Sequence, residues 1–255
     1  MLVAVGWSAS AQQPFFTDDA DVTPKRKFHF ELSNQYSFLP TSAFPNRQQN
    51  TLVYQLNYGL FDGFELGVDS PHIVIVNARN TVRPRVPYGI GDTNLTLKWN
   101  FRREAQGSKW PGLTIAYAVE LPTGETRTQL GSGIVDHRLV VVAQKHLSAR
   151  NTLRINQGVL FTGNNLTGVV GLRSTGLVYL SGASLTRQFA PRLSLGVEVN
   201  GAFAQRGAQN RAALQQQIGG KYSLRDNLTL DFGGIIGQFG ESPRFGLQIG
   251  FSLDF

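Results

Sequence analysis

Strict alternation of apolar and polar residues limits what this chain can fold into more than any other feature. The last stretch, Phe245 to Phe255, places an apolar side chain at every second position, with polar residues or glycine between them. Alternation at this period gives a β-strand one apolar face and one wet face. The terminal strand of a soluble sheet is usually shorter, and chain ends tend to be polar and frayed. The ending therefore indicates a strand that must be paired along its whole length.

The same alternation recurs along the chain and predicts about twelve strands, most of them near the roughly 9 to 11 residues of a tilted membrane strand. It is clear in residues 28–38, 51–58, 64–69, 94–101, 113–121, 193–199, 214–222, 228–232 and 244–255, and looser in 134–147, 151–162 and 174–188. No segment shows convincing helical periodicity, so we expect an all-β chain.

The connections between these segments alternate in length. Most links after even-numbered strands are tight, and the exception is 102–110; the links after odd-numbered strands are longer, at 40–49, 76–88, 122–132, 163–171 and 204–210. Short turns on one side and longer loops on the other are typical of outer-membrane barrels, whose short side is periplasmic. We therefore predict an antiparallel up-and-down transmembrane β-barrel in the outer membrane of a Gram-negative bacterium.

Barrel closure explains the regular ending. Unpaired backbone groups in hydrocarbon cost several kcal/mol each, so the first and last strands must pair. An aromatic last residue, Phe255, also resembles the signal that the barrel-assembly machinery reads, and we expect that machinery to be a partner.

The alternative fold is a soluble β-sandwich or a lipocalin-like barrel, in which the apolar faces turn inward. Two observations favour the membrane barrel. Charges of both signs lie near the centres of the polar faces, and aromatic residues lie toward the strand ends, where interfacial girdles form. Those central charges are Glu31, Lys98, Glu198 and Asp231.

Three regions divide the chain. Residues 1–11 resemble the remnant of a secretory signal peptide, because Ala9-Ser10-Ala11 forms a cleavage pattern after a short apolar stretch. Residues 12–26 form a periplasmic N-terminal lead, and residues 27–255 form the barrel. An ordinary apolar strand at residues 1–11 is the alternative.

The lead contains the acidic stretch Asp18-Asp19-Ala20-Asp21. Calcium prefers several oxygen ligands, but the spacing and glycine of an EF-hand loop are absent. The stretch is interpreted as a solvated acidic patch. The same lead could instead fold into the barrel mouth as a plug, and the sequence leaves both readings open.

Composition excludes several functions. The chain has no cysteine, which rules out disulfides and thiolate metal sites, and no stretch of about 18 apolar residues that a membrane helix needs. The net charge is +7, but the basic residues are spread along the chain, so we expect no nucleic acid partner.

A hydrolase is the least favoured function. Asp136, His137 and Ser132 lie close in sequence, as in some lipid-modifying barrels, but neighbours on one strand point to opposite faces. Nothing resembles a nucleophile elbow. The sequence thus predicts no catalytic residue, metal or cofactor.

Residues at the alternate strand positions that form the polar faces are the candidates for lining the lumen. They are Lys27, His29, Glu31, Gln35, Gln55, Asn57, Glu65, Lys98, Asn100, Glu120, Arg138, Arg154, Asn156, Glu198, Asn200, Gln215, Gln217, Lys221, Asp231, Arg244 and Gln248. A barrel of about twelve strands lies between the filled eight-stranded barrels and the open porins, so we expect a narrow pore. Their mixed charge predicts weak ion selectivity.

The loop 77–85 carries three arginines, Arg79, Arg83 and Arg85. Arginine binds phosphate in a bidentate fashion, so these residues could contact lipopolysaccharide. The loop could also fold inward and constrict the pore, or simply be solvated.

Three stretches resemble a known family. They are Gly89-Ile90-Gly91-Asp92-Thr93 leading into Leu95–Trp99, Glu120-Leu121-Pro122-Thr123-Gly124-Glu125, and Gly131-Ser132-Gly133-Ile134-Val135-Asp136. In this order and spacing they are similar to the family labelled "putative MetA-pathway of phenol degradation", from about Thr17 to Phe255. The resemblance implies an outer-membrane transporter-like barrel associated with uptake of aromatic compounds, and it carries no catalytic residues.

We therefore expect passive outer-membrane passage of small solutes, aromatic or hydrophobic ones among them. The alternatives are a structural or adhesive barrel with a plugged lumen and, less favoured, a lipid-modifying enzyme. Outer-membrane lipid and lipopolysaccharide are the expected surroundings.

Overall fold

The computed structural model describes residues 13–78, 84–162, 176–204, 212–239 and 242–255. The described residues form strands and one short 3-10 helix, Thr41–Ala43. The strands are β1 (Phe28–Phe38), β2 (Asn46–Phe61), β3 (Phe64–Asn77), β4 (Tyr88–Ile90), β5 (Thr93–Arg102), β6 (Gly112–Leu121), β7 (Asp136–Ser148), β8 (Asn151–Thr162), β9 (Gly176–Ala190), β10 (Leu193–Ala204), β11 (Ala212–Arg225), β12 (Leu228–Gln238) and β13 (Phe245–Asp254). No helix in these ranges is long and apolar enough to cross a membrane.

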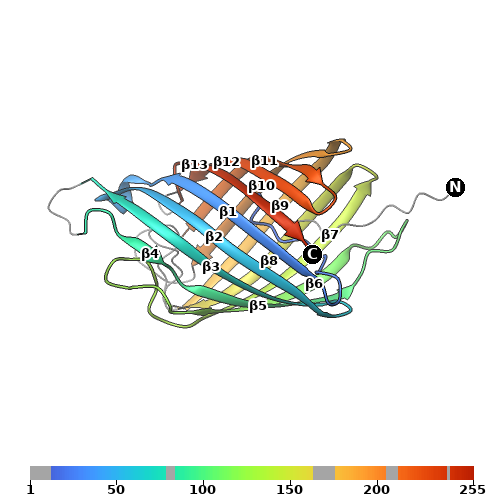
Figure 1. Ribbon diagram of the computed structural model, residues 1–255, viewed down its shortest axis with the longest axis horizontal. Coiled ribbons are helices and arrows are strands. Elements are labelled where there is room, and N and C mark those ends of the chain that lie inside the picture. Colours follow the sequence, from blue (N-terminus) through green and yellow to red (C-terminus); the bar gives the residue numbers. More distant parts are fainter. Residues whose placement is uncertain (1–12, 79–83, 163–175, 205–211, 240–241) are drawn as a thin grey trace.

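The strands close into one tilted barrel (Figure 1). Each strand pairs antiparallel with its sequence neighbours, except that β4 pairs only with β3, and β5 takes the next place beside β3. The first and last strands pair over ten positions, from His29 opposite Asp254 to Phe38 opposite Phe245. The described residues therefore form a closed barrel of twelve strands plus the short β4, which confirms the predicted fold class.

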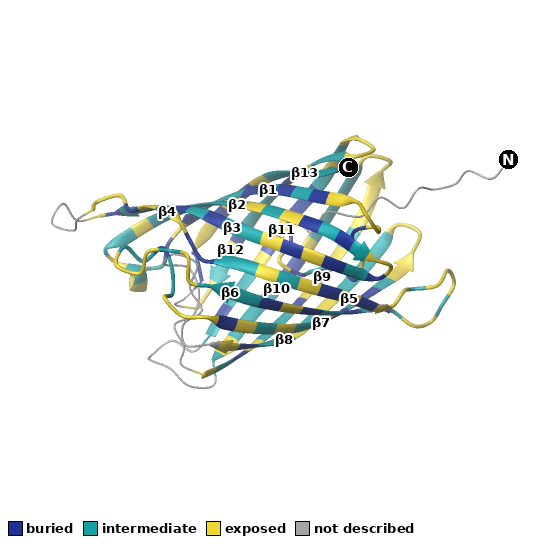
Figure 2. Cartoon of the chain, turned by 60° about the horizontal axis from the view of Figure 1, so that its bottom comes forward, coloured by how far each residue is buried: buried dark blue, intermediate teal, exposed yellow. Residues whose placement is uncertain are grey.

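The apolar faces point outward. On β5 the side chains of Leu95, Leu97 and Trp99 are 42–45% exposed, whereas Lys98 between them is only 3% exposed. Exposed and buried positions alternate in the same way around the barrel (Figure 2). A soluble sandwich or lipocalin-like barrel would bury these apolar side chains, because water disfavours a continuous apolar surface. The orientation matches a barrel whose outside meets lipid.

Aromatic residues gather at the strand ends. Phe28 lies with its ring 4.7 Å from that of Tyr58 and 5.5 Å from that of Phe255. A second group joins Phe64 and Trp99, whose rings stack at 5.6 Å. Aromatic rings at the strand ends are typical of the girdles that mark a membrane interface.

The connections have the predicted asymmetry. Only two residues separate β2 from β3, β7 from β8, β9 from β10 and β11 from β12. On that periplasmic side only the 103–111 connection is longer, as expected. The opposite, extracellular end carries the long 122–135 loop.

Candidate functional site: the barrel lumen and the segment that crosses it

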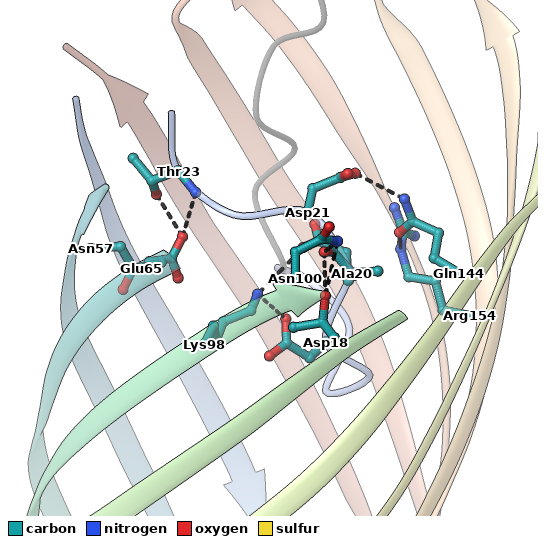
Figure 3. A network of polar contacts seen from close by, with 12 residues as sticks. Asp18, Ala20, Asp21, Thr23, Asn57, Glu65, Lys98, Asn100, Gln144 and Arg154 are labelled. Carbon is teal, nitrogen blue, oxygen red and sulfur yellow. Dashed lines mark hydrogen bonds and ion pairs between the residues drawn. The ribbon is translucent and has the colours of Figure 1, made fainter. Parts of the chain in front are cut away.

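The N-terminal lead lies inside the barrel. From its junction with β1, the segment 13–24 runs across the lumen and contacts side chains from most of the wall (Figure 3). Residues 1–12, which include the expected signal remnant, are outside the described part of the chain.

A buried carboxylate holds each end of this segment. Glu198 on β10 accepts the backbone N–H of Phe16 at 3.0 Å and that of Thr17 at 2.6 Å. Glu65 on β3 accepts the N–H of Thr23 at 2.6 Å. Hydrogen bonds to an ionised acceptor are stronger than neutral ones, and stronger still away from water. These two glutamates therefore anchor the lead to opposite parts of the wall.

The acidic stretch of the lead is not a solvated patch, and that interpretation was wrong. Lys98 Nζ lies 2.7 Å from Asp18 Oδ1 and 3.6 Å from Asp19 Oδ1, and the Lys98 side chain is 3% exposed. Asp21 accepts a hydrogen bond from Gln144 at 2.8 Å. A buried ammonium is costly without a partner, so the aspartates neutralise a charge that faces the lumen.

Side-chain amides and hydroxyls also satisfy the carbonyls of the lead. Asn100 and Thr114 both donate to the carbonyl of Ala20, the latter at 2.5 Å. Gln217 donates to the carbonyl of Pro14 at 2.5 Å. Buried backbone groups need such partners, so the wall is chemically complementary to this segment.

Glycines lie where the lead passes closest to the wall. Gly196, Gly219 and Gly233 are aligned across β10, β11 and β12. A Cβ on Gly219 would lie 2.8 Å from Pro14 Cγ, and one on Gly182 would lie 2.7 Å from Thr17 Cγ2. Real Cβ atoms do not approach other carbons so closely, so these positions leave room for the lead. This feature was not predicted from the sequence, although the glycines occupy the alternate strand positions that face inward.

A cavity of about 480 Å³ adjoins the lead inside the barrel. Residues 13 and 15–18 form one boundary, and side chains of the barrel strands form the rest. Of the predicted lumen residues, the following line this cavity: Gln55, Asn57, Glu65, Lys98, Arg138, Asn156, Asn200 and Gln215.

The remaining predicted lumen residues lie elsewhere. His29, Glu31, Asn100, Glu198, Gln217, Asp231 and Gln248 are buried, and Gln35, Glu120, Arg154 and Lys221 are partly buried. Lys27 and Arg244 are exposed, because each precedes a strand at the barrel rim. His29 contacts Asp254 at 2.6 Å and Glu31 at 2.9 Å, so it belongs to a polar cluster near the barrel seam. Their part in solute passage stays a prediction.

Part of the cavity wall is apolar, which the sequence analysis did not anticipate. The apolar lining residues on inward-facing strand positions are Val53, Ala116, Ala118, Val140, Leu180, Ala202 and Ala213. Along their strands these residues lie an even number of positions from inward polar residues, such as Glu120 and Arg138. That spacing could have identified them as inward-facing.

The three stretches that carry the family resemblance meet at one point. Asp92 Oδ1 accepts the N–H of Gly124 at 2.9 Å, and its Oδ2 accepts that of Ser132 at 2.5 Å. This clasp holds the 122–135 loop, whose Leu130 packs in a buried cluster with Ile73 and Ile75. The stretches therefore have a structural role at the extracellular end.

The arginine loop is only partly described. Arg79 and Arg83 lie outside the described residues. Arg85 is exposed, and its carbonyl accepts the N–H of Asn77 at 3.1 Å. The constriction and the lipopolysaccharide contact stay predictions.

Asp136 and His137 face opposite sides of the wall. The Asp136 side chain is 1% exposed and points inward, whereas His137 is exposed and lies 2.8 Å from the hydroxyl of Tyr117. Ser132 is engaged by Asp92 through its N–H. The described geometry does not bring these residues together as a triad.

The closed lipid-facing barrel defines an outer-membrane protein with the architecture of channels and porins, located in the outer membrane of a Gram-negative bacterium. The chain belongs to the family described as "Putative MetA-pathway of phenol degradation", whose sequence profile matches residues 73–255, and this confirms the resemblance. A search of curated proteins gave no match.

Solved structures share the fold at low sequence identity. The COG4313 outer membrane channel from Pseudomonas putida F1 superposes with a TM-score of 0.72 at 14% identity, covering 93% of this chain and 99% of that one. The NanC porin gives 0.62 at 9% identity, covering 88% and 98%. The KdgM porin gives 0.55 at 8% identity, covering 89% and 99%. Each of these three solved structures is named as an outer membrane channel or a porin.

Proposed function

We propose that this barrel is a passive outer-membrane channel for small solutes, aromatic or hydrophobic ones among them. The observation that carries the proposal is the cavity of about 480 Å³ inside the barrel, where an apolar wall lies beside polar groups. Ligand sites of about 300 to 1,000 Å³ with mainly apolar walls and a few polar groups are typical for small molecules.

The N-terminal lead makes the passage through the barrel selective among solutes, because it occupies part of the lumen. It crosses the lumen between Glu65 and Glu198, so a solute must pass beside it or displace it. Twelve strands enclose less space than the about 16 strands of a porin, so a bound segment of this size narrows the passage strongly. Small solutes are therefore favoured over sugars or peptides.

The proposal also includes two contacts outside the lumen. Phe255 serves as the signal for the barrel-assembly machinery, since it is exposed and directly follows the closing strand β13. Arg85 and its loop contact lipopolysaccharide phosphates at the extracellular rim, where arginine forms bidentate hydrogen bonds.

A structural or adhesive barrel with a permanently plugged lumen is the second candidate. The observation that favours it is the number of buried hydrogen bonds that hold the lead, including those to Glu198 and Glu65. The two candidates differ in whether any solute crosses the membrane.

Flux measurements distinguish them. We expect proteoliposomes containing the full-length protein to admit a small aromatic probe faster than protein-free liposomes, with little entry of sucrose and weak ion selectivity. Cells that lack their general porins should take up the same probe faster when they express the protein. If no ion, sugar or aromatic probe crosses in either system, passage is excluded and the plugged structural barrel stands.

A further inference from the structure

A groove of about 1010 Å³ lies on the outer side of the barrel wall. It extends over β9 to β13 and β1, which lie side by side in the barrel (Figure 1). Among its lining residues Val197, Ile218 and Leu247 are 52%, 67% and 54% exposed on the lipid-facing side. Within the described part of the chain, the groove shares no lining residue with the lumen cavity. It therefore opens to the membrane and not to the pore.

The strand register gives this groove a direction. A row of directly opposite residues runs through it: Asn151, Arg187, Leu195, Gly220, Phe232, Ile249 and Asn34. Asn151 begins β8 beside a periplasmic turn, whereas Asn34 lies near the middle of β1. Because the strands of membrane barrels are tilted, the row climbs from the periplasmic rim toward the bilayer midplane. Neighbouring strands are about 4.8 Å apart, so the distance from Arg187 to Asn34 along the wall is about 24 Å.

Glycine leaves the floor of the groove bare. Gly234 on β12 lies opposite Ile218 and Leu247 of the neighbouring strands, and a Cβ there would meet no atom within 4 Å. The preceding Gly233 faces the lumen, where a Cβ would lie 3.5 Å from Pro14 Cβ. The wall thus has no side chain on either face at this point, and the lead covers only the inner face. In a membrane close packing rather than water exclusion drives such contacts, so a hollow with fixed walls favours one bound apolar chain.

The periplasmic end of the groove is basic. Arg187 lies opposite Asn151, and its guanidinium carbon lies 5.7 Å from the centre of the Phe189 ring. No ion pair joins Arg187 to a carboxylate among the residues that the structure describes. The turns that adjoin it carry the exposed Arg150 and Arg192 and contain no acidic residue. Guanidinium groups bind phosphate oxygens in a bidentate fashion, and basic clusters at a bilayer surface favour anionic headgroups.

The two ends of the groove distinguish between possible occupants. A phospholipid of the periplasmic leaflet places its phosphate at this rim and its acyl chains toward the midplane, which is the order of the groove. Lipopolysaccharide has its phosphates at the opposite, extracellular end. A second copy of the chain crosses the bilayer in the same direction, so its own arginine-bearing periplasmic turns would meet this basic rim. Like charges placed together at an interface disfavour that contact.

We propose that this outer groove binds one anionic phospholipid of the periplasmic leaflet. Its phosphate lies against Arg187 and Asn151, and one acyl chain lies over Gly234. The site goes beyond the proposed channel function and does not depend on it, because the groove is on the outer face of the wall. The bound chain covers the barrel wall from outside where Pro14 covers it from inside.

Native mass spectrometry of the folded full-length protein in detergent tests the proposal, because it counts bound lipids and reports the oligomeric state. The probes are a phosphatidylglycerol and a phosphatidylcholine with the same oleoyl chains, which differ in net charge. We expect one phosphatidylglycerol to bind about fivefold more tightly than phosphatidylcholine, and further molecules to bind weakly.

Two variants test the charged end. Arg187→Gln should weaken phosphatidylglycerol binding about fivefold and leave phosphatidylcholine binding unchanged. Arg103→Gln is the matched control, because it removes an exposed arginine from the same end of the barrel, in the 103–111 connection. It should leave the binding of both lipids unchanged. Arg187→Lys keeps the charge but loses the bidentate geometry, so its loss should be smaller, and it replaces Arg187→Gln if that variant does not assemble.

A second pair of variants tests the apolar floor. Gly234→Leu fills the floor and should weaken the binding of both lipids several-fold. Ala183→Leu adds the same side chain at an exposed position of β9 outside the groove and should change neither.

Three results would overturn the proposal. Equal losses in Arg187→Gln and Arg103→Gln would reduce the effect to the overall charge of the rim. Unchanged lipid binding in Gly234→Leu would remove the groove as the place where the chain lies. A dimer in the parent protein that is lost in Gly234→Leu would assign the groove to a second copy of the chain.

Discussion

The N–H and the hydroxyl of Thr17 both donate to Oε2 of Glu198, at 2.6 and 2.7 Å, across a sequence separation of 181 residues. The contact ties the N-terminal lead to the far wall of the barrel. Because the acceptor is a buried carboxylate, breaking it in the folded protein leaves an unpaired charge. The lead is therefore an integral part of the lumen, and changes that displace it should change the pore.

The first prediction is that Gly182→Leu displaces the lead and opens the pore. A Cβ at this position meets Thr17 Cγ2 at 2.7 Å, whereas the nearest wall atom is Asn200 Cβ at 3.6 Å. The added side chain should therefore strain the lead far more than the barrel. We expect a several-fold rise in single-channel conductance in planar bilayers.

Gly234→Leu is the matched control, because a Cβ there meets nothing within 4 Å. It should leave conductance at the level of the unmodified protein. Equal conductance in both variants and the parent would mean that the lead does not limit flow.

The second prediction tests the two faces of the wall. Leu247 is 54% exposed on the outer face, so Leu247→Arg should lower the free energy of unfolding by roughly 2–4 kcal/mol if it lies near the bilayer midplane. Gln55→Arg should cost much less, because Gln55 lines the cavity. Urea titrations of folding into lipid vesicles measure both changes, and a larger loss for Gln55→Arg would reverse the assignment.

Much of the wall could be predicted from the sequence because a strand has only two faces. Along β5 the parity of Lys98 against Leu97 and Trp99 determined which side meets lipid, and the structure has that order. The short strand β4 was missed, because three residues carry no readable alternation. Its Tyr88 pairs with Val74, in a part of β3 beyond the stretch 64–69 where the alternation is clear.

The interior was harder to predict, because its contacts are long-range. Asp18 lies 80 residues from Lys98, and no local pattern connects an acidic stretch to one lysine on a strand. Parity did place Lys98 on the inner face. The inward glycines, Gly196 and Gly219 among them, were equally visible, but a missing side chain indicates a close approach without naming what approaches.

The third prediction concerns the chain end. Phe28 and Phe255 exchange backbone hydrogen bonds at 2.8 and 3.0 Å, and their rings stack at 5.5 Å. Phe255→Asp should therefore reduce the assembled fraction several-fold by weakening both closure and the assembly signal. The control Phe189→Asp removes an aromatic residue that is 57% exposed at the end of β9, away from the terminus. Heat-modifiable migration on gels gives the assembled fraction, and equal effects would remove any special role for the last residue.

The fourth prediction is that Asp92→Ala releases the 122–135 loop. The carboxylate accepts the N–H groups of Gly124 and Ser132, so its loss leaves two donors without their partner. We expect trypsin to cleave after Arg127 much faster in folded protein, while the barrel itself stays intact. Asp62→Ala, in the exposed turn between β2 and β3, should not change the cleavage rate at Arg127. An unchanged rate in Asp92→Ala would show that the clasp is not what holds the loop.

The last prediction is a pH dependence in the periplasmic 103–111 connection. Burial acts to raise the pKa of Glu104, but hydrogen bonds from Lys145 and His146 outweigh it and hold the pKa below its ordinary value. The backbone N–H of His146 donates to Glu104 Oε2 at 3.0 Å, and the His146 ring lies 2.8 Å from the same oxygen. Because the folded-state pKa is depressed, the stabilisation is present above the ordinary glutamate pKa and is lost as the pH falls through the depressed value.

Hydrogen exchange at the His146 amide measures this effect when Glu104→Gln and the unmodified protein are compared at equal pH, which cancels the intrinsic rate. At neutral pH the variant should exchange faster, since a neutral amide oxygen is a weaker acceptor than a carboxylate. The difference should shrink on acidification, because the unmodified glutamate then becomes neutral as well. A difference that persists unchanged in acid would assign the protection of His146 to packing of the connection rather than to the charge on Glu104.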